Sequence, residues 1–338
     1  MATFVDDCAI AYKSKVHFDK LAADLKKYGF NFTVEASLSD FLGVKLSRHG
    51  DTSFHMTQTT LIEKIIEYTG MTDSNGVYVP AEKKPLGIDP EGDPHDAPWN
   101  YRSVTGMLMF LANNSRPDLC YSVSQCCRHN HNPKASHTKA VKKIVRYLVA
   151  TKDKGTILTP SDSLNLDLYV DCDFAGLYKS DPDREPTSAK SRMGYILFFS
   201  NCPLVVKSAL LNEVGLSVCE VEYGSLSYAT CTLLCVQRLV KEVVKKLGLD
   251  RVLDRPSIRC TIFEDNAATY QLASTHQLTN RTRYFHVKWH WFWQYVGEGS
   301  SRLFNLIKVS THDMIADAFT KGLQREVFER LRKKYMGW

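Results

Sequence analysis

The sequence lacks the features that would tie it to a membrane. No apolar run reaches the roughly 18 residues that a membrane-spanning helix needs. The N-terminal stretch, Met1 to Asp7, has neither the basic region nor the long apolar region of a secretory signal. These absences exclude a membrane-spanning helix and a signal peptide of the usual kind. We therefore expect a soluble, intracellular protein with no membrane partner.

Cysteine is present, but the spacing of a structural zinc site is missing. Among ten cysteines, no Cys-x2-Cys pair faces a second pair, and no run of Cys and His has finger spacing. Cys126 and Cys127 are adjacent, and Cys231 and Cys235 stand one helical turn apart. This pattern predicts buried free thiols in a reducing compartment. Internal repeats and low-complexity tracts are also lacking.

The positive charge is small in total but unevenly placed. Lys plus Arg is 43 against 37 acidic residues, a net charge of +6, which permits a polyanionic partner without requiring one. Seven basic residues and one acid lie between Lys134 and Lys154. A helix expected over 137–150 carries four of them off its apolar stripe: Lys139, Lys142, Lys143 and Arg146. Taken alone, such a basic face is simply solvated.

Composition and periodicity divide the 338 residues into four stretches. Residues 1–76 predict a strand, a helix, a hairpin around the turn at 49–51 and a second helix. Residues 77–98 contain five prolines, which indicates a linker or an extended arm. A helical block follows over 99–160. Residues 161–338 then alternate strands with helices, which predicts a mixed α/β domain.

Acids on successive elements of this last stretch could carry metal chemistry. Two-metal phosphodiester hydrolysis needs several carboxylates around cations about 3.5–4 Å apart, and Mg2+ prefers oxygen ligands. The candidates are Asp171 on the first strand, Glu222 at the start of a long helix, Asp265 at a strand end and Asp317 in a late helix. Each one alone is more often a solvated or helix-capping acid, so spacing leaves both interpretations open.

A series of short motifs runs in order along nearly the whole chain. Phe4-Val5-Asp6-Asp7 is similar to the Tyr-Val-Asp-Asp hairpin of reverse transcriptases, and Phe41 to Val44 to the segment that follows it. The remaining motifs are Tyr101–Gly106, Ser115–Asp118, Arg146–Leu148, Asp171–Gly176, Leu216–Tyr223, Glu264–Asn266, Arg281–Arg283 and Ala316–Lys321. Together they resemble the polyprotein of copia-type LTR retrotransposons, from the polymerase palm to the end of RNase H.

The resemblance implies a fold and a domain order. The fold class would be α/β, with an α+β polymerase remnant followed by an RNase H-like mixed five-stranded sheet flanked by helices. Residues 1–76 would be the truncated end of the reverse-transcriptase palm, and 77–98 a Pro-rich linker. Residues 99–160 would form the helical thumb or connection, and 161–338 the RNase H-like domain.

The resemblance also implies an activity and a site. The activity would be that of an Mg2+-dependent endonuclease acting on the RNA strand of an RNA–DNA hybrid. The family's four acids, which would hold two Mg2+ ions or Mn2+ in their place, fall on Asp171, Glu222, Asp265 and Asp317. The family's thumb helix, which grips duplex backbone, implies phosphate binding by Lys139, Lys142, Lys143 and Arg146. Partners would be hybrid, duplex nucleic acid and the rest of the polyprotein, in the cytoplasm, a virus-like particle or the nucleus.

Departures from the family pattern keep a second hypothesis open. Asp6 and Asp7 would be a remnant of the polymerase motif, because the third palm aspartate lies upstream of the hairpin and is absent here. We therefore expect no primer extension. Val206 stands where the family usually has Trp, and Val218-Cys219 replace two small hydroxyl residues. The alternative is a catalytically decayed retroelement fragment that only binds nucleic acid.

Overall fold

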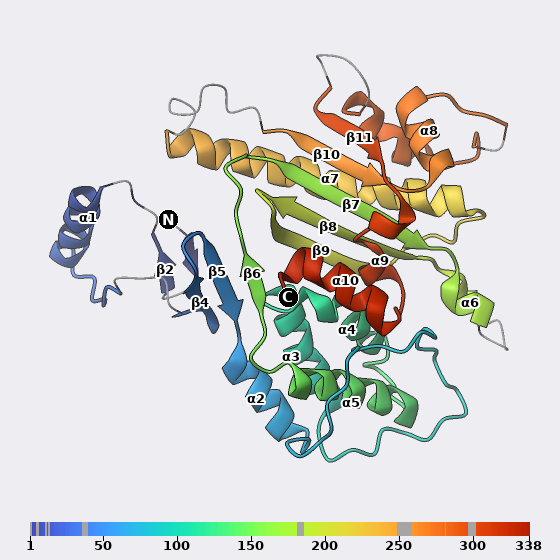
Figure 1. The fold of residues 1–338 in the computed structure, drawn as a ribbon, viewed down its shortest axis with the longest axis horizontal. Coiled ribbons are helices and arrows are strands. Elements are labelled where there is room, and N and C mark those ends of the chain that lie inside the picture. Colours follow the sequence, from blue (N-terminus) through green and yellow to red (C-terminus); the bar gives the residue numbers. More distant parts are fainter. Residues whose placement is uncertain are drawn as a thin grey trace.

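The protein is described here by a computed structural model, which confirms the predicted α/β class (Figure 1). It describes residues 2–4, 7–10, 12, 14–35, 40–180, 186–248, 258–280, 282–296 and 302–338. The elements of the first half are β1 (Ala2–Phe4), β2 (Asp7–Ala9), α1 (Lys15–Lys27), β3 (Asp40–Phe41), β4 (Val44–His49), β5 (Ser53–Thr57), α2 (Thr59–Tyr68), α3 (Tyr101–Asn113), η1 (Pro117–Leu119), α4 (Cys120–Cys127), α5 (Ala135–Ala150) and β6 (Thr156–Leu158). Those of the second half are β7 (Leu166–Asp173), α6 (Gly176–Ser180), η2 (Pro186–Ala189), β8 (Arg192–Phe199), β9 (Cys202–Leu210), α7 (Val218–Lys246), β10 (Cys260–Glu264), α8 (Ala267–Thr275), η4 (Val287–Gln294), β11 (Phe304–Lys308), η5 (Thr311–Asp313), α9 (Asp317–Thr320) and α10 (Arg325–Met336).

The main sheet has the order β11-β10-β7-β8-β9 among the described residues, which is consistent with an RNase H-like fold. Strands β7, β8 and β9 are antiparallel neighbours, whereas β10 runs parallel to both β7 and β11. The parallel pairing brings the carboxyl ends of β7 and β10 to one edge of the sheet. That edge is where acids at strand ends can meet.

Helices cover both faces of this sheet, as the alternation along β8 shows. Tyr195 and Leu197 belong to the core beneath the long helix α7. Ile196 and Phe198 belong to a second core that contains residues of α9 and α10. Because successive side chains of a strand point to opposite faces, a strand covered on both faces must be apolar at almost every position. This explains the continuous apolar run of β8.

The helical block forms a separate core below the sheet in Figure 1. The predicted apolar stripe of α5 is buried there, with Val141, Ile144, Val145 and Leu148 each at most 1 % exposed. Phe328 of α10 joins the same core, so the C-terminal helix links it to the face of the sheet.

The predicted hairpin is present, since β4 and β5 pair antiparallel. The structure adds a strand that the sequence pattern did not predict. Residues 156–158 fall within the predicted helical block, but they form β6 and pair antiparallel with β5. The open edge of β5 supplies the hydrogen-bonding groups for this pairing, and no local pattern could reveal it.

The Pro-rich stretch runs alongside α5 (Figure 1). The backbone N–H of Val77 donates to the carbonyl of Arg146 at 3.3 Å, and that of Ala135 donates to the carbonyl of Asp93 at 2.8 Å. The ring Nε2 of His137 lies 2.8 Å from the carbonyl oxygen of Gly87. These contacts hold the stretch against both ends of the helix. No helix in the described part of the chain has the length and apolar composition to cross a membrane.

Candidate metal centre

Three of the predicted acids converge at the edge where the parallel strands end. Asp171 lies near the end of β7, Asp265 directly follows β10, and Glu222 lies near the start of α7. One carboxylate oxygen from each lies within 4.8 Å of the others. Asp171 and Glu222 are buried, and Asp265 is half-buried. Acids on separate elements come together here because the parallel strands and the N-terminus of α7 share one end of the sheet.

The fourth predicted acid, Asp317, lies beside Asp171, outside that group of three. It begins α9, and its carboxylate Oδ1 is 2.7 Å from the Nζ of Lys321. The same Nζ lies 3.9 Å from Oδ2 of Asp171, so one ammonium contacts both acids. Burial lowers the pKa of Lys321, but the charges of Asp171 and Asp317 outweigh burial and raise it above its usual value. Lys321 is therefore a permanent cation within the acidic cluster.

Close packing of α9 on the sheet positions these groups. The hydroxyl of Thr320 donates a hydrogen bond to the Asp171 carboxylate. Gly194 of β8 makes room for this approach, because a Cβ there would lie 2.6 Å from Cγ2 of Thr320 and 2.9 Å from Cβ of Phe319. The glycine is thus required by the short distance between β8 and α9.

A fifth carboxylate, which the sequence analysis did not assign, belongs to the same cluster. Glu264 ends β10 and is fully buried. Its Oε1 accepts a hydrogen bond of 3.0 Å from the backbone N–H of Asn266. Within the Glu264–Asn266 motif, the resemblance to the family points to Asp265 alone. The sequence signal that could have identified Glu264 is the position of an acid directly at the end of an apolar strand.

Burial and mutual repulsion dominate the electrostatics of the cluster. Burial, then the charges of Glu264, Asp171 and Asp265, raise the pKa of Glu222 well above its ordinary value. Burial also raises the pKa of Glu264. Burial and the charge of Asp171 raise the pKa of Asp265, although a hydrogen bond from Thr311 lowers it. Several acids with raised pKa in one place indicate a site built for added positive charge.

The donor atoms fit a hard divalent cation. Oε2 of Glu222 and Oε2 of Glu264 are buried and have no hydrogen-bond partner among the described residues. A buried carboxylate oxygen without a partner is costly unless a cation or another donor satisfies it. The grouped ligand atoms are all carboxylate oxygens, which suit Mg2+ or Mn2+. Asp171, Glu222 and Asp265 could therefore bind a metal ion.

The two acids of the polymerase motif, Asp6 and Asp7, stand near the N-terminus of the sequence. Asp6 lies outside the described residues, as does the side chain of Asp7. The backbone of Asp7 is in β2 and pairs with Phe4 of β1, as expected for a hairpin.

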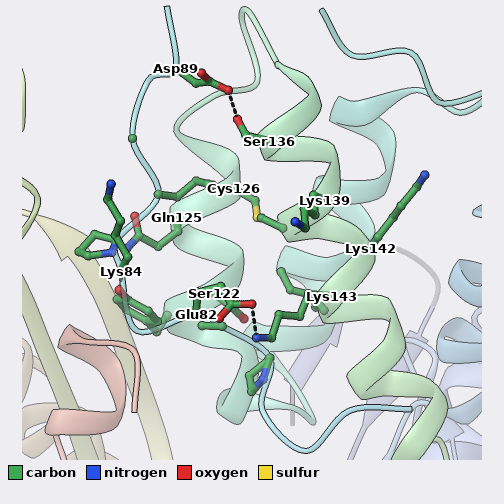
Figure 2. A pocket seen from close by; sticks show the side chains of 18 of the residues that line it. Glu82, Lys84, Asp89, Ser122, Gln125, Cys126, Ser136, Lys139, Lys142 and Lys143 are labelled. Carbon is green, nitrogen blue, oxygen red and sulfur yellow. Dashed lines mark hydrogen bonds and ion pairs between the residues drawn. The ribbon is translucent and has the colours of Figure 1, made fainter. Parts of the chain in front are cut away.

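The basic residues of α5 divide into two pairs, and Figure 2 shows three of the four, Lys139, Lys142 and Lys143. Lys143 points toward Glu82 of the Pro-rich stretch and forms an ion pair with it. The Nε of Arg146 donates to the carbonyl of Asn75 at 2.7 Å. Lys139 and Lys142 are exposed, and Lys142 points away from the stretch. Along this face, a cavity of about 930 Å³ separates residues 77–90 from α4 and α5.

The amino-acid sequence of this chain is similar to those of known retroelement polyproteins. The chain is 29 % identical over 334 residues to the "Retrovirus-related Pol polyprotein from transposon RE2" of Arabidopsis thaliana, covering 99 % of this chain and 21 % of that protein. The corresponding protein of transposon RE1, from the same plant, is also 29 % identical over 334 residues, with the same coverage. That of transposon TNT 1-94 of Nicotiana tabacum is 29 % identical over 343 residues, covering 99 % of this chain and 24 % of that protein.

These matches confirm the predicted resemblance to Pol polyproteins of copia-type transposons. Over nearly its whole length the chain is similar to one region of a retrotransposon polyprotein. It spans between 21 % and 24 % of the length of these relatives. No protein-family profile matches the chain.

Proposed function

We propose that this chain is an RNase H-type endonuclease that cleaves the RNA strand of an RNA–DNA hybrid. The observation that carries the proposal is the convergence of Asp171, Glu222 and Asp265 within 4.8 Å at one edge of the main sheet. The similarity to Pol polyproteins supports a nucleic-acid substrate. The unpartnered oxygens of Glu222 and Glu264 support the binding of divalent cations, Mg2+ or Mn2+.

Each acid has a distinct place in this proposal. Asp171 belongs to the group of three and also lies beside the Lys321–Asp317 pair, so it is the ligand that two cations would share. Glu222 and Asp265 complete the first position, and Asp317 completes the second. When bound, the two ions would activate a water and stabilise the leaving oxygen. Thr320 holds the Asp171 carboxylate in place through its hydrogen bond.

Hybrid would be recognised through its backbone and shape, with little reading of bases. Lys139 and Lys142 are exposed on α5 and are the first candidates for phosphate contacts. Lys143 and Arg146 would join them only by giving up their contacts with Glu82 and Asn75. Other parts of the polyprotein would be further partners, in the cytoplasm, in a virus-like particle or in the nucleus.

The test compares the parent protein with Asp171→Asn on a labelled RNA–DNA hybrid, with Mg2+ and with EDTA. Asn keeps the shape of the side chain and removes its charge, so the variant should fold and bind hybrid. Because it lacks the ligand that two cations would share, its cleavage rate should fall by at least about a hundredfold. Asp167→Asn is the matched control, because Asp167 lies on the same face of β7 and outside the cluster.

Two outcomes count against the proposal in different ways. Equal cleavage by the parent and by Asp171→Asn would show that the acids are wrongly assigned. Binding of hybrid by the parent with no cleavage in Mg2+ or Mn2+ would favour the decayed fragment that only binds nucleic acid.

A further inference from the structure

Lys321 is the last residue of the Ala316–Lys321 motif, and it lies within the acidic cluster. It follows α9 directly, one helical turn after Asp317. Its Nζ lies 2.7 Å from Oδ1 of Asp317 and 3.9 Å from Oδ2 of Asp171. These are the two acids that, in the proposed function, would hold the second cation. The ammonium therefore already supplies a positive charge between them.

The placement separates the four acids into two groups. Asp171, Glu222 and Asp265 have ligand oxygens within 4.8 Å of one another, and Asp317 is not in that group. Its Oδ1 faces the ammonium of Lys321. Two like charges a few ångströms apart repel strongly in a partly buried site. A divalent cation between Asp317 and Asp171 would therefore compete directly with Lys321.

Lys321 can leave this place without unfolding the site. Its side chain is 40 % exposed, whereas that of Asp317 is 12 % exposed and that of Asp171 is 6 % exposed. Its backbone is extended, with φ −143° and ψ 159°, so it lies beyond the last turn of α9. A flexible four-carbon side chain at such a position can turn toward solvent. The carboxylates, in contrast, are held by the surrounding elements.

We propose that Lys321 is a built-in counter-ion that holds Asp317 beside Asp171 in the metal-free protein and withdraws when a divalent cation binds between them. This inference rests on the proposed function for the identity of the second cation position. It makes Lys321 a positioning residue that controls the order of binding. The first ion binds at Asp171, Glu222 and Asp265, and the second binds more weakly because it must displace the ammonium.

The experiment measures Mn2+ binding to the full chain without nucleic acid, by calorimetry and by the electron paramagnetic resonance signal of free Mn2+. In Lys321→Met, the second Mn2+ should bind on the order of tenfold more tightly, because the competing charge is gone. The first should change little. Lys321→Arg keeps the charge and should retain the weak second binding. Lys333→Met is the matched control, since Lys333 is exposed on α10, away from the cluster.

A second measurement uses the parent protein and needs no variant. Two neighbouring carboxylates favour the protonated form of an amine, so a paired ammonium reacts slowly with an amine-modifying reagent and a withdrawn one reacts faster. Labelling of Lys321, followed by mass spectrometry, should therefore rise several-fold when Mn2+ is added, while labelling of Lys333 stays constant. Unchanged or slower labelling of Lys321 with Mn2+ would overturn the proposal, as would a second Mn2+ that binds Lys321→Met no more tightly than the parent.

The results separate this inference from the proposed function. Mn2+ binding as described, without cleavage of hybrid, would refute the nuclease and leave the role of Lys321 standing. Cleavage of hybrid with Mn2+ binding that does not respond to Lys321 would refute only the counter-ion. If neither the parent nor the variants bind Mn2+, both proposals fall.

Discussion

Replacing Asp317 by Asn should stabilise the metal-free protein near neutral pH. Burial, followed by the charge of Asp171, raises the pKa of Asp317 from 3.8 to about 7, despite the opposing effect of Lys321. Ionisation of this carboxyl therefore makes the folded protein less stable relative to the unfolded chain. Asn has nearly the same shape and cannot ionise, so it removes this cost.

Proton linkage gives the sign and the size of the effect. Because the folded pKa is raised, the stability from the protonated carboxyl is fully present below about pH 4 and is lost as the pH rises through about 7. A pKa of about 7 in place of 3.8 corresponds to roughly 4 kcal/mol upon full ionisation. Neighbouring buried acids share these protons, so we expect Asp317→Asn to gain about half of that value. The gain in unfolding free energy should be on the order of 2 kcal/mol at pH 8 and small at pH 4.

The assay is urea unfolding in EDTA, followed by tryptophan fluorescence, at several pH values between 4 and 8. The free energy of unfolding should fall with rising pH more steeply in the parent than in Asp317→Asn. Asp313→Asn is the control of opposite sign, because a hydrogen bond from Lys334 lowers the pKa of that exposed carboxyl. Parallel pH profiles for the parent and Asp317→Asn would refute the reasoning. In saturating Mn2+ the parent should instead be more stable than Asp317→Asn, since the ion needs the carboxylate.

Three further predictions concern other parts of the chain. Arg116→Met should cost about 3–5 kcal/mol of unfolding free energy, because the fully buried Arg116 makes two 2.9 Å hydrogen bonds to Asp118 and its loss leaves that charge unpaired; thermal or urea unfolding measures this. Gly194→Ala should weaken Mn2+ binding and cost about 1–3 kcal/mol, because its Cβ would lie 2.6 Å from Cγ2 of Thr320; unchanged binding in calorimetry would contradict this. Lys142→Glu should reduce the slope of log binding constant against log salt for duplex by about one; a changed sequence preference with an unchanged slope would indicate base contacts.

The amino-acid sequence by itself determined most of the local elements and four of the five clustered acids. The alternation of Leu166, Leu168 and Val170 is typical of a strand with one buried face, and all three are fully buried in β7. The spacing of Val141 and Ile144 predicted the inward stripe of α5 in the same way. Such patterns are readable because they depend on residues two to four positions apart. The motifs then selected Asp171, Glu222, Asp265 and Asp317 from many other acids.

Only the tertiary structure decided which distant groups meet. It placed Glu264 in the acidic cluster, set Lys321 between Asp317 and Asp171, and paired Lys143 with Glu82 across 61 positions of sequence. It also added β6 to the edge of β5. None of these contacts leaves a periodic trace, because each depends on how whole elements pack. The charge of a buried acid is likewise decided by its neighbours in space, and the sequence does not reveal them.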